Sequence, residues 1–192
     1  MAEQHGGRDL RAVLARAGFE AVAAGSRDIR AEHLLLAMLD ESSAEPGGGR
    51  VRAALAGSGL DHGRLTEALR TERAHSLAAA GFSMLADERL TATRLPSTPS
   101  LDSSSREALS VGHRTLTRDR MAAQREAHRR RTPRGGEPVA PSRAHGRPGG
   151  GEFALAIGVL SAELGTVARA LALAGLDRQA LLEAVRHAAG QA

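Results

Sequence analysis

Two segments of the chain are copies of one another, and this repeat limits the possible folds more than any other feature. Residues 51–69 are VRAALAGSGLDHGRLTEAL, and residues 167–185 are VARALALAGLDRQALLEAV. Ten of these 19 positions are identical at a constant offset of 116 residues, which is far more than an Ala- and Leu-rich composition produces. The repeat therefore predicts a fold built from two similar halves.

The repeated unit has the pattern of two helices joined by a tight turn. Gly59 and Gly175 stand where a first helix should end, because glycine adopts the left-handed conformation of a Schellman ending without a Cβ penalty. Asp61 and Asp177 follow, and their carboxylates can accept hydrogen bonds from the free amides of the next helix. In such an ending the residue after the glycine packs onto the residue that stands four positions before the glycine. This predicts the contacts Leu60 on Leu55 and Leu176 on Leu171.

Weaker similarity extends the repeat toward the N-terminus of each half and reveals an insertion. Residues 21–29 match residues 108–116 at an offset of 87, and residues 33–39 match residues 154–160 at an offset of 121. The offset increases by 34 residues between these two matches, which is the length of the segment 117–150. This segment is therefore predicted to be an insertion between the first and second helices of the second repeat.

Each repeat is predicted to hold four helices in a single domain that spans residues 8–189. Repeat one covers 8–80, a linker covers 81–102, and repeat two covers 103–189. Ser104 and Glu107 have the spacing of a capping box at the start of the second repeat. The helices are expected near residues 8–24, 30–41, 49–57, 61–79, 103–115, 152–161, 163–173 and 177–189.

Composition favours an all-α fold and excludes several chemistries. Hydrophobic residues make up 42% of the chain but aromatic residues only 2%, so the core must be built from Leu, Ala and Val. The absence of Lys excludes a Walker A loop and a Schiff base, and the absence of Cys excludes thiol catalysis, disulfides and cysteine-ligated zinc. The longest purely apolar run, 34–39, is too short to span a bilayer. We expect a cytoplasmic protein that needs no cofactor or metal and is not an enzyme.

The positive charge is concentrated in the insertion. Residues 117–150 hold nine Arg against three acidic residues, whereas the rest of the chain holds 17 Arg against 19 acidic residues. The insertion is also rich in Pro and Gly, so we expect it to be disordered beyond about Arg131, although 118–131 could extend a helix. Electrostatic contacts with a partner are expected from Arg125, Arg129, Arg130, Arg131 and Arg134.

Two motifs resemble the Clp repeat (Clp R) domain, which forms the N-terminal domain of Clp unfoldases. Residues 25–39, GSRDIRAEHLLLAML, resemble the family signature LGHNxIGTEHLLLGLL, and residues 51–61 resemble its turn AxxVLxxLGVD. Residues 95–99, LPSTP, are similar to the family's entry into its second repeat. The resemblance covers nearly the whole chain apart from 117–150. It implies two pseudo-symmetric four-helix repeats in one compact domain.

The resemblance also implies a function. The family binds substrates and adaptor proteins, so this chain is expected to be a free-standing protein-binding module without ATPase modules. It would act as an adaptor, regulator or decoy, with Clp unfoldase or protease subunits and their substrate proteins as partners. By resemblance, peptide or phosphoarginine binding would involve Glu32 and His33 in repeat one and Glu152 in repeat two. In the other possible alignment of repeat two, Phe153 takes the position of Glu152.

Other interpretations remain open from the residues alone. Glu32 and His33 could simply be a helix-start acid beside a packed or capping histidine. The Gly-turn units and the Arg-rich insertion could instead form a nucleic-acid-binding protein of the helix-turn-helix type. Against that alternative, the helix 61–73 carries Arg64, Arg70 and Arg73 against three acidic residues and therefore has no net positive charge. A purely scaffolding partner of a protease core is the third possibility.

Overall fold

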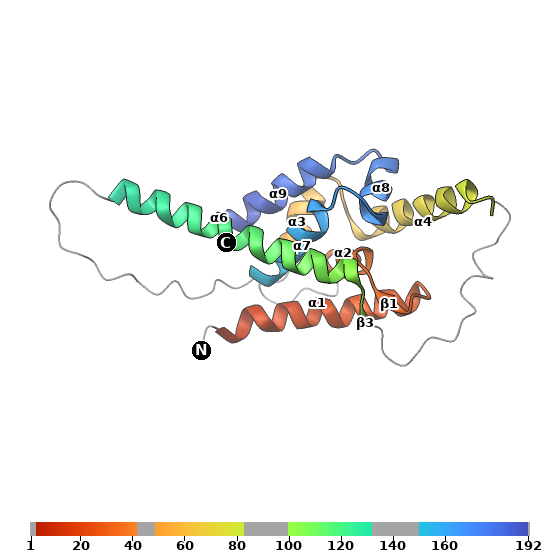
Figure 1. The fold of residues 1–192 in the computed structure, drawn as a ribbon, viewed down its shortest axis with the longest axis horizontal. Helices are drawn as coiled ribbons and strands as arrows, with labels where there is room; N and C mark the ends of the chain where they lie inside the picture. The colour runs from red at the N-terminus through yellow and green to blue at the C-terminus, as the bar shows by residue number, and fades with distance from the viewer. Residues whose placement is uncertain (1–2, 42–48, 83–99, 132–149, 192) are drawn as a thin grey trace.

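The chain folds as a compact all-α domain, and its computed structural model describes residues 3–41, 49–82, 100–131 and 150–191 (Figure 1). Within these residues, two short strands, β1 (Asp28–Ile29) and β3 (Ser100–Leu101), pair in parallel. The eight helices of the described residues are α1 (Glu3–Ala23), α2 (Ala31–Leu39), α3 (Arg50–Gly57), α4 (His62–Ala79), α6 (Ser103–Arg131), α7 (Gly150–Ser161), α8 (Thr166–Leu173) and α9 (Arg178–Gly190).

Helices α2 and α7 form the centre of the core. Every residue of α2 from His33 to Leu39 is buried, as is every residue of α7 from 152 to 160. One continuous hydrophobic cluster joins them to residues of both halves of the chain, and its only aromatic member is Phe153. The expected core of Leu, Ala and Val is therefore confirmed. A helix that is apolar on all sides can only be stable when other helices cover it completely, which explains the central place of α2 and α7.

Both predicted glycine turns have the expected hydrogen bonds. At the end of α3, the Leu60 amide donates to the Leu55 carbonyl at 2.9 Å, and the Gly59 amide donates to the Ala56 carbonyl at 2.9 Å. The same pair of bonds closes α8, from Leu176 to Leu171 and from Gly175 to Ala172. Asp61 Oδ1 then accepts from the Arg64 amide at 2.7 Å, and Asp177 Oδ1 accepts from the Gln179 amide at 2.8 Å. Local sequence alone specifies these two turns.

The two halves interlock instead of lying side by side as separate bundles. Helix α4 of the first half packs on α8 of the second, and α3 of the first half packs on α9 of the second (Figure 1). The third helix of each half thus contacts the fourth helix of the other. The pseudo-symmetry of the two repeats remains a prediction.

Residues 21–29 and 108–116 match in sequence but differ in backbone conformation. Gly25 has a φ of 66° and ends α1, after which the chain enters β1. Its predicted counterpart, Gly112, lies inside α6. The two glycines therefore serve different purposes.

Gly112 and Gly158 allow α6 and α7 to cross at very short distance. A Cβ atom added to Gly112 would lie less than 3.0 Å from the carbonyl of Ala154, and one added to Gly158 would lie less than 3.0 Å from the carbonyl of Ala108. Because the obstructing atoms belong to the backbone, no side-chain movement can make room. Each helix thus presents an alanine and a glycine four residues apart to the other, as close helix pairs require.

The antiparallel pairing of α6 and α7 also determines where α6 leaves the domain. Position 158 faces 108 and position 154 faces 112, so the first residue of α7, at 150, lies opposite residue 116. Helix α6 nevertheless continues to Arg131. Residues 118–131 therefore extend a helix already nucleated by the domain, as the sequence allowed, and the disorder expected of the insertion does not apply to them. Residues 132–149, including Arg134, lie outside the described residues.

Among the described residues, no single helix has both the length and the apolar composition needed to cross a membrane. Helices α7 and α8 satisfy this requirement only when taken together, across a bend of 74°.

The crossing predicts that Gly112→Ala or Gly158→Ala will destabilise the domain. Either methyl group forces the two central helices apart, and we expect the free energy of unfolding to fall by about 1–3 kcal/mol or more. Urea denaturation followed by circular dichroism measures this change.

The matched control is Gly57→Ala, because Gly57 also lies in a helix but a Cβ there would contact nothing within 4 Å. This control should be neutral or stabilising by up to about 1 kcal/mol. Equal effects at all three positions would contradict the proposed role of the crossing.

Candidate functional site

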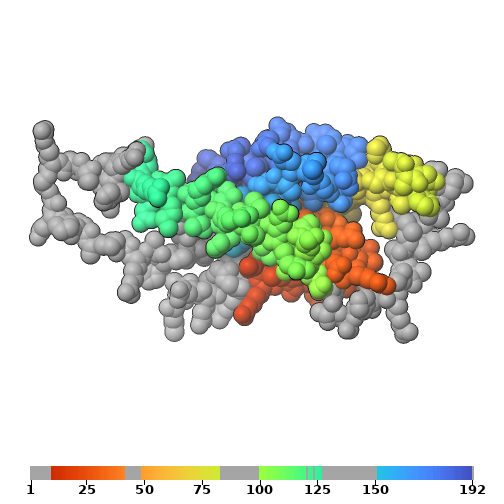
Figure 2. Space-filling view, in the orientation of Figure 1, coloured from red at the N-terminus to blue at the C-terminus, as the bar shows by residue number. Residues whose placement is uncertain are grey.

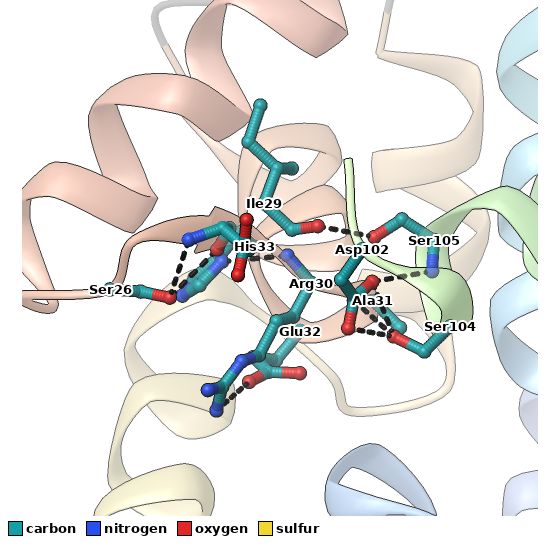
Figure 3. Close-up of polar contacts among 10 residues, drawn as sticks. Ser26, Ile29, Arg30, Ala31, Glu32, His33, Asp102, Ser104 and Ser105 are labelled. Atoms are coloured by element: carbon teal, nitrogen blue, oxygen red, sulfur yellow. Dashed lines mark hydrogen bonds and ion pairs between the residues drawn. The ribbon is translucent and has the colours of Figure 1, made fainter. Parts of the chain in front are cut away.

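The first turn of α2 carries Glu32 and His33, the two residues of the predicted site in repeat one. His33 is buried and serves the backbone: its Nδ1 accepts a hydrogen bond from the Arg30 amide at 3.0 Å (Figure 3). The Arg30 carbonyl in turn accepts from the amide of His33 at 3.0 Å. Nδ1 can accept only when that nitrogen carries no proton. The interpretation of His33 as a capping residue is therefore confirmed, and His33 is part of the frame of the site.

The environment keeps His33 neutral. Burial, with a smaller contribution from the positive charge of Arg30, lowers the pKa of its imidazole from 6.5 to about 4. The carboxylate of Asp102 acts in the opposite direction. Over the physiological range the ring is thus a fixed acceptor for the start of α2.

Contacts between the halves place the start of α6 against the start of α2. Ser105 is buried and its hydroxyl donates to the Ile29 carbonyl at 2.7 Å, while Asp102 Oδ1 accepts from the Ser105 amide at 2.8 Å (Figure 3). The N-cap of α6 is therefore Asp102, and the capping box predicted from Ser104 and Glu107 is wrong. The Ser104 hydroxyl instead donates to Asp102 Oδ1 at 2.8 Å and lies 3.4 Å from the Ala31 amide as an acceptor.

Glu32 lies on this frame with its carboxylate mostly withdrawn from water. Its side chain is 13% exposed, and one carboxylate oxygen is 3.9 Å from Arg30 Nη1. Burial raises the pKa of Glu32 above its ordinary value of 4.5. A backbone hydrogen bond and the charge of Arg30 oppose this increase, whereas the carboxylates of Asp102 and Glu72 add to it. An approaching cation would therefore stabilise the charged form of Glu32.

Two adjoining cavities share Arg30, Glu32 and Thr166 in their walls. The first, of about 500 Å³, lies between the start of α2 and the middle of α4. The second, of about 630 Å³, lies between the starts of α2 and α6 and the turn that joins α7 to α8. We call the two cavities together the inter-half groove. Glu32 therefore borders a groove between the two halves.

Glu72 is a groove residue that the sequence analysis did not identify. It is 4% exposed, lines the first cavity, and accepts hydrogen bonds from Ser76 Oγ at 2.8 Å and Arg169 Nε at 2.7 Å. The bond to Arg169 connects α4 to α8 across the two halves. Glu72 is one of the three acidic residues counted in the predicted helix 61–73, and its position seven residues after the buried Leu65 places it on the core-facing side.

The other predicted site residues lie elsewhere. Glu152 is buried in the first turn of α7 and lines neither cavity of the groove, so it does not join Glu32 in one site. Phe153, the alternative, is a core residue under Arg50, whose guanidinium carbon is 5.7 Å from the ring centre. Arg125 is exposed on α6, far along the chain from the groove residues, and the positions of Arg129, Arg130 and Arg131 belong to the last turn of the same helix.

Comparison with known proteins identifies no relative: no protein-family model matches the chain, and no curated protein matches its sequence. Within the part of the chain that the structure describes, no group of three or more His, Asp or Glu side chains is arranged to hold a metal ion.

The burial of His33 predicts a loss of stability at acidic pH. Between pH 6.5 and 4 the unfolded chain binds a proton at this residue and the folded chain does not, so the free energy of unfolding decreases as the pH falls. The contribution of His33 should be about 2–3 kcal/mol over this interval.

Urea unfolding at several pH values measures this dependence. In His33→Gln the slope between pH 6.5 and 4 should be shallower than in the natural protein. In the control His75→Gln, which changes an exposed residue of α4, the slope should not change. Identical slopes in all three proteins would rule out the assigned role of His33.

Proposed function

We propose that this chain is a non-catalytic protein-binding module of a Clp unfoldase–protease system, which holds segments of partner proteins in the inter-half groove. The observation that carries the proposal is the position of Glu32. Its carboxylate, largely withdrawn from water, forms part of the wall shared by two cavities and stands at the start of a completely buried helix. A rigid helix start that carries a poorly solvated charge is suited to recognising a complementary charge.

The chemistry of the second cavity favours a basic residue flanked by apolar ones, whereas the first cavity has Arg30, Arg70 and Arg73 beside Glu32 and Glu72. The second cavity has Glu32, Asp102, Glu107 and Glu163 in its walls against the single cation of Arg30. Its other lining residues include small and apolar side chains of α6, α7 and α8, and Leu164 at its rim is 88% exposed. A guanidinium or ammonium group would offset the negative charge, while neighbouring aliphatic groups would cover Leu164.

The Clp context of the proposal rests on the resemblance of residues 25–39 and 51–61 to the Clp repeat. Binding without catalysis allows three modes of action. An adaptor would bring substrates to the unfoldase, a regulator would change its activity, and a decoy would compete for its substrates.

Glu32→Gln tests the proposal with minimal change in shape. The substitution removes the charge that would attract a basic segment, so affinity should fall by at least about tenfold for an unfolded protein substrate or for purified Clp subunits. Surface plasmon resonance with the full chain immobilised measures these affinities, and an arginine-phosphorylated peptide serves as a further probe. A degradation assay with the Clp unfoldase and protease then separates the modes, since an adaptor accelerates degradation and a decoy slows it.

The matched control is Glu41→Gln, because Glu41 is exposed, carries the same charge and lines neither cavity of the groove. This variant should bind as the natural protein does. Absence of binding to both Clp subunits and unfolded protein would overturn the proposal, as would equal losses in the two variants.

The same substitution should have the opposite effect on stability. Because the pKa of Glu32 is raised in the folded protein, the charged form costs stability above that pKa, and a neutral glutamine avoids this cost. We therefore expect Glu32→Gln to have a higher Tm than the natural protein at pH 7, and the difference should shrink as the pH is lowered through the pKa of Glu32. Differential scanning calorimetry at pH 7 and pH 4 measures both quantities. A lower Tm at pH 7 would show that Glu32 is a structural residue.

A further inference from the structure

The second part of α6 projects from the domain as a free helix. We define the α6 arm as residues 117–131, which begin just beyond the point where α7 ends its contact with α6. Every arm side chain that the structure describes is exposed, whereas Gly112 and Ala108 in the first part of α6 are buried. The arm extends away from the body of the molecule at one end (Figures 1 and 2).

The arm is strongly basic. Its 15 residues include six Arg and two acidic residues, which gives a net charge of +4. Its only large apolar residue is Met121. Such a helix has no apolar stripe with which to pack on the domain. An ion pair forms within the arm, where Arg118 Nε lies 3.7 Å from Asp119 Oδ1, and the arm keeps its net charge of +4.

Four arginines of α6 share one face. At 3.6 residues per turn, the positions 114, 118, 125 and 129 fall within about 60° of one another around the helix axis and span about 22 Å along it. The acidic positions 119 and 126 lie about 60° or more outside this sector. The positions that cross α7, 108 and 112, lie on the same side of the helix as the acidic positions, about 60–100° outside the sector, so the sector points sideways from the crossing. We call it the arginine face; the side chains of Arg114, Arg118 and Arg125 are exposed.

We propose that the arginine face of α6, which runs from Arg114 along the arm, binds the phosphate backbone of double-stranded nucleic acid. A row of guanidinium groups along one helix face complements a regular row of phosphates and releases the counterions condensed on them. The arm side chains that the structure describes are exposed, and the diameter of a helix, about 10–12 Å, matches the roughly 12 Å width of the major groove of DNA. This surface is separate from the inter-half groove and extends the proposed function.

The observations favour nucleic acid over an acidic protein as the occupant. Protein interfaces depend on a central cluster of buried apolar or aromatic side chains, and the arm offers a single methionine. Phosphate contacts require only exposed charge in a fixed geometry. Because the contacts are to the backbone, binding should be independent of base sequence and strongly dependent on salt.

The salt dependence of binding to a fluorescent 20-base-pair duplex tests the proposal. We expect the full chain to bind at 50 mM salt, with the logarithm of the association constant decreasing with the logarithm of salt concentration at a slope of about −3.6, the value for four phosphate contacts. Fluorescence anisotropy measures the affinity. A second duplex of unrelated sequence should bind equally well.

Two triple variants distinguish the arginine face from net charge. The variant Arg118→Gln, Arg125→Gln, Arg129→Gln removes three arginines of the face and should reduce affinity at 50 mM salt by at least about 100-fold, with a slope near −0.9. The control Arg120→Gln, Arg130→Gln, Arg131→Gln removes the same charge from the rest of the arm and should retain a slope near −3.6. Glutamine is a good helix former, so both variants keep the arm helical, which circular dichroism verifies.

Three results would overturn the proposal: no duplex binding by the natural protein at 50 mM salt, equal losses of affinity in the two triple variants, or binding of polyglutamate in preference to the duplex. The last result would assign the arm to an acidic protein. Neither triple variant alters the inter-half groove, so binding of Clp subunits provides a separate readout and its failure is distinguishable from failure of this proposal.

Discussion

The close crossing of α6 and α7 is the contact on which the rest of the structure depends. Helix α7 is buried along nearly its whole length, and it can lie this near to α6 only because Gly112 and Gly158 have no side chains. The crossing brings the beginning of α6 beside the turn that follows α7, and this juxtaposition forms one wall of the inter-half groove. Because of the same antiparallel register, α6 continues past the end of α7 after residue 116. One backbone contact thus positions both the groove and the arm.

The inter-half groove combines two helix starts that are fixed by hydrogen bonds with one carboxylate, that of Glu32, whose charge is unfavourable in the free protein. His33, Asp102 and Ser105 satisfy the backbone at the starts of α2 and α6, so these two helix starts are held together by directed hydrogen bonds. Glu32 stands on that frame with its charge poorly solvated and near other carboxylates. Such an arrangement costs stability in the free protein, and groups with perturbed pKa values are concentrated at functional sites. Glu72 lines the first cavity beside Arg70 and Arg73 and, through Arg169, joins the two halves.

The two predicted repeats differ in their first helices. Helix α1 ends at Gly25 in a left-handed turn and leads into β1, whereas α6 passes through the corresponding position and continues to Arg131. A glycine at the same place in the repeat therefore ends a helix in one half and permits a helix crossing in the other. The difference gives the second half a basic extension that the first half lacks, and it separates two surfaces of opposite charge on one small domain.

The sequence by itself determined the helices, the two glycine turns and their aspartate caps, because these features depend on residues within one or two turns of each other. It also located the buried helix 33–39 and placed Glu32 and His33 at its start. Only the tertiary structure decided the role of Gly112, the burial of Glu72, the N-cap at Asp102 and the helical state of 117–131. Each of these depends on a partner distant in sequence: Gly112 on the carbonyl of Ala154, Glu72 on Arg169, and the arm on the domain that nucleates its helix. Local patterns cannot report such contacts, because the same residues are equally compatible with a turn, an exposed charge or a disordered segment until the chain has packed.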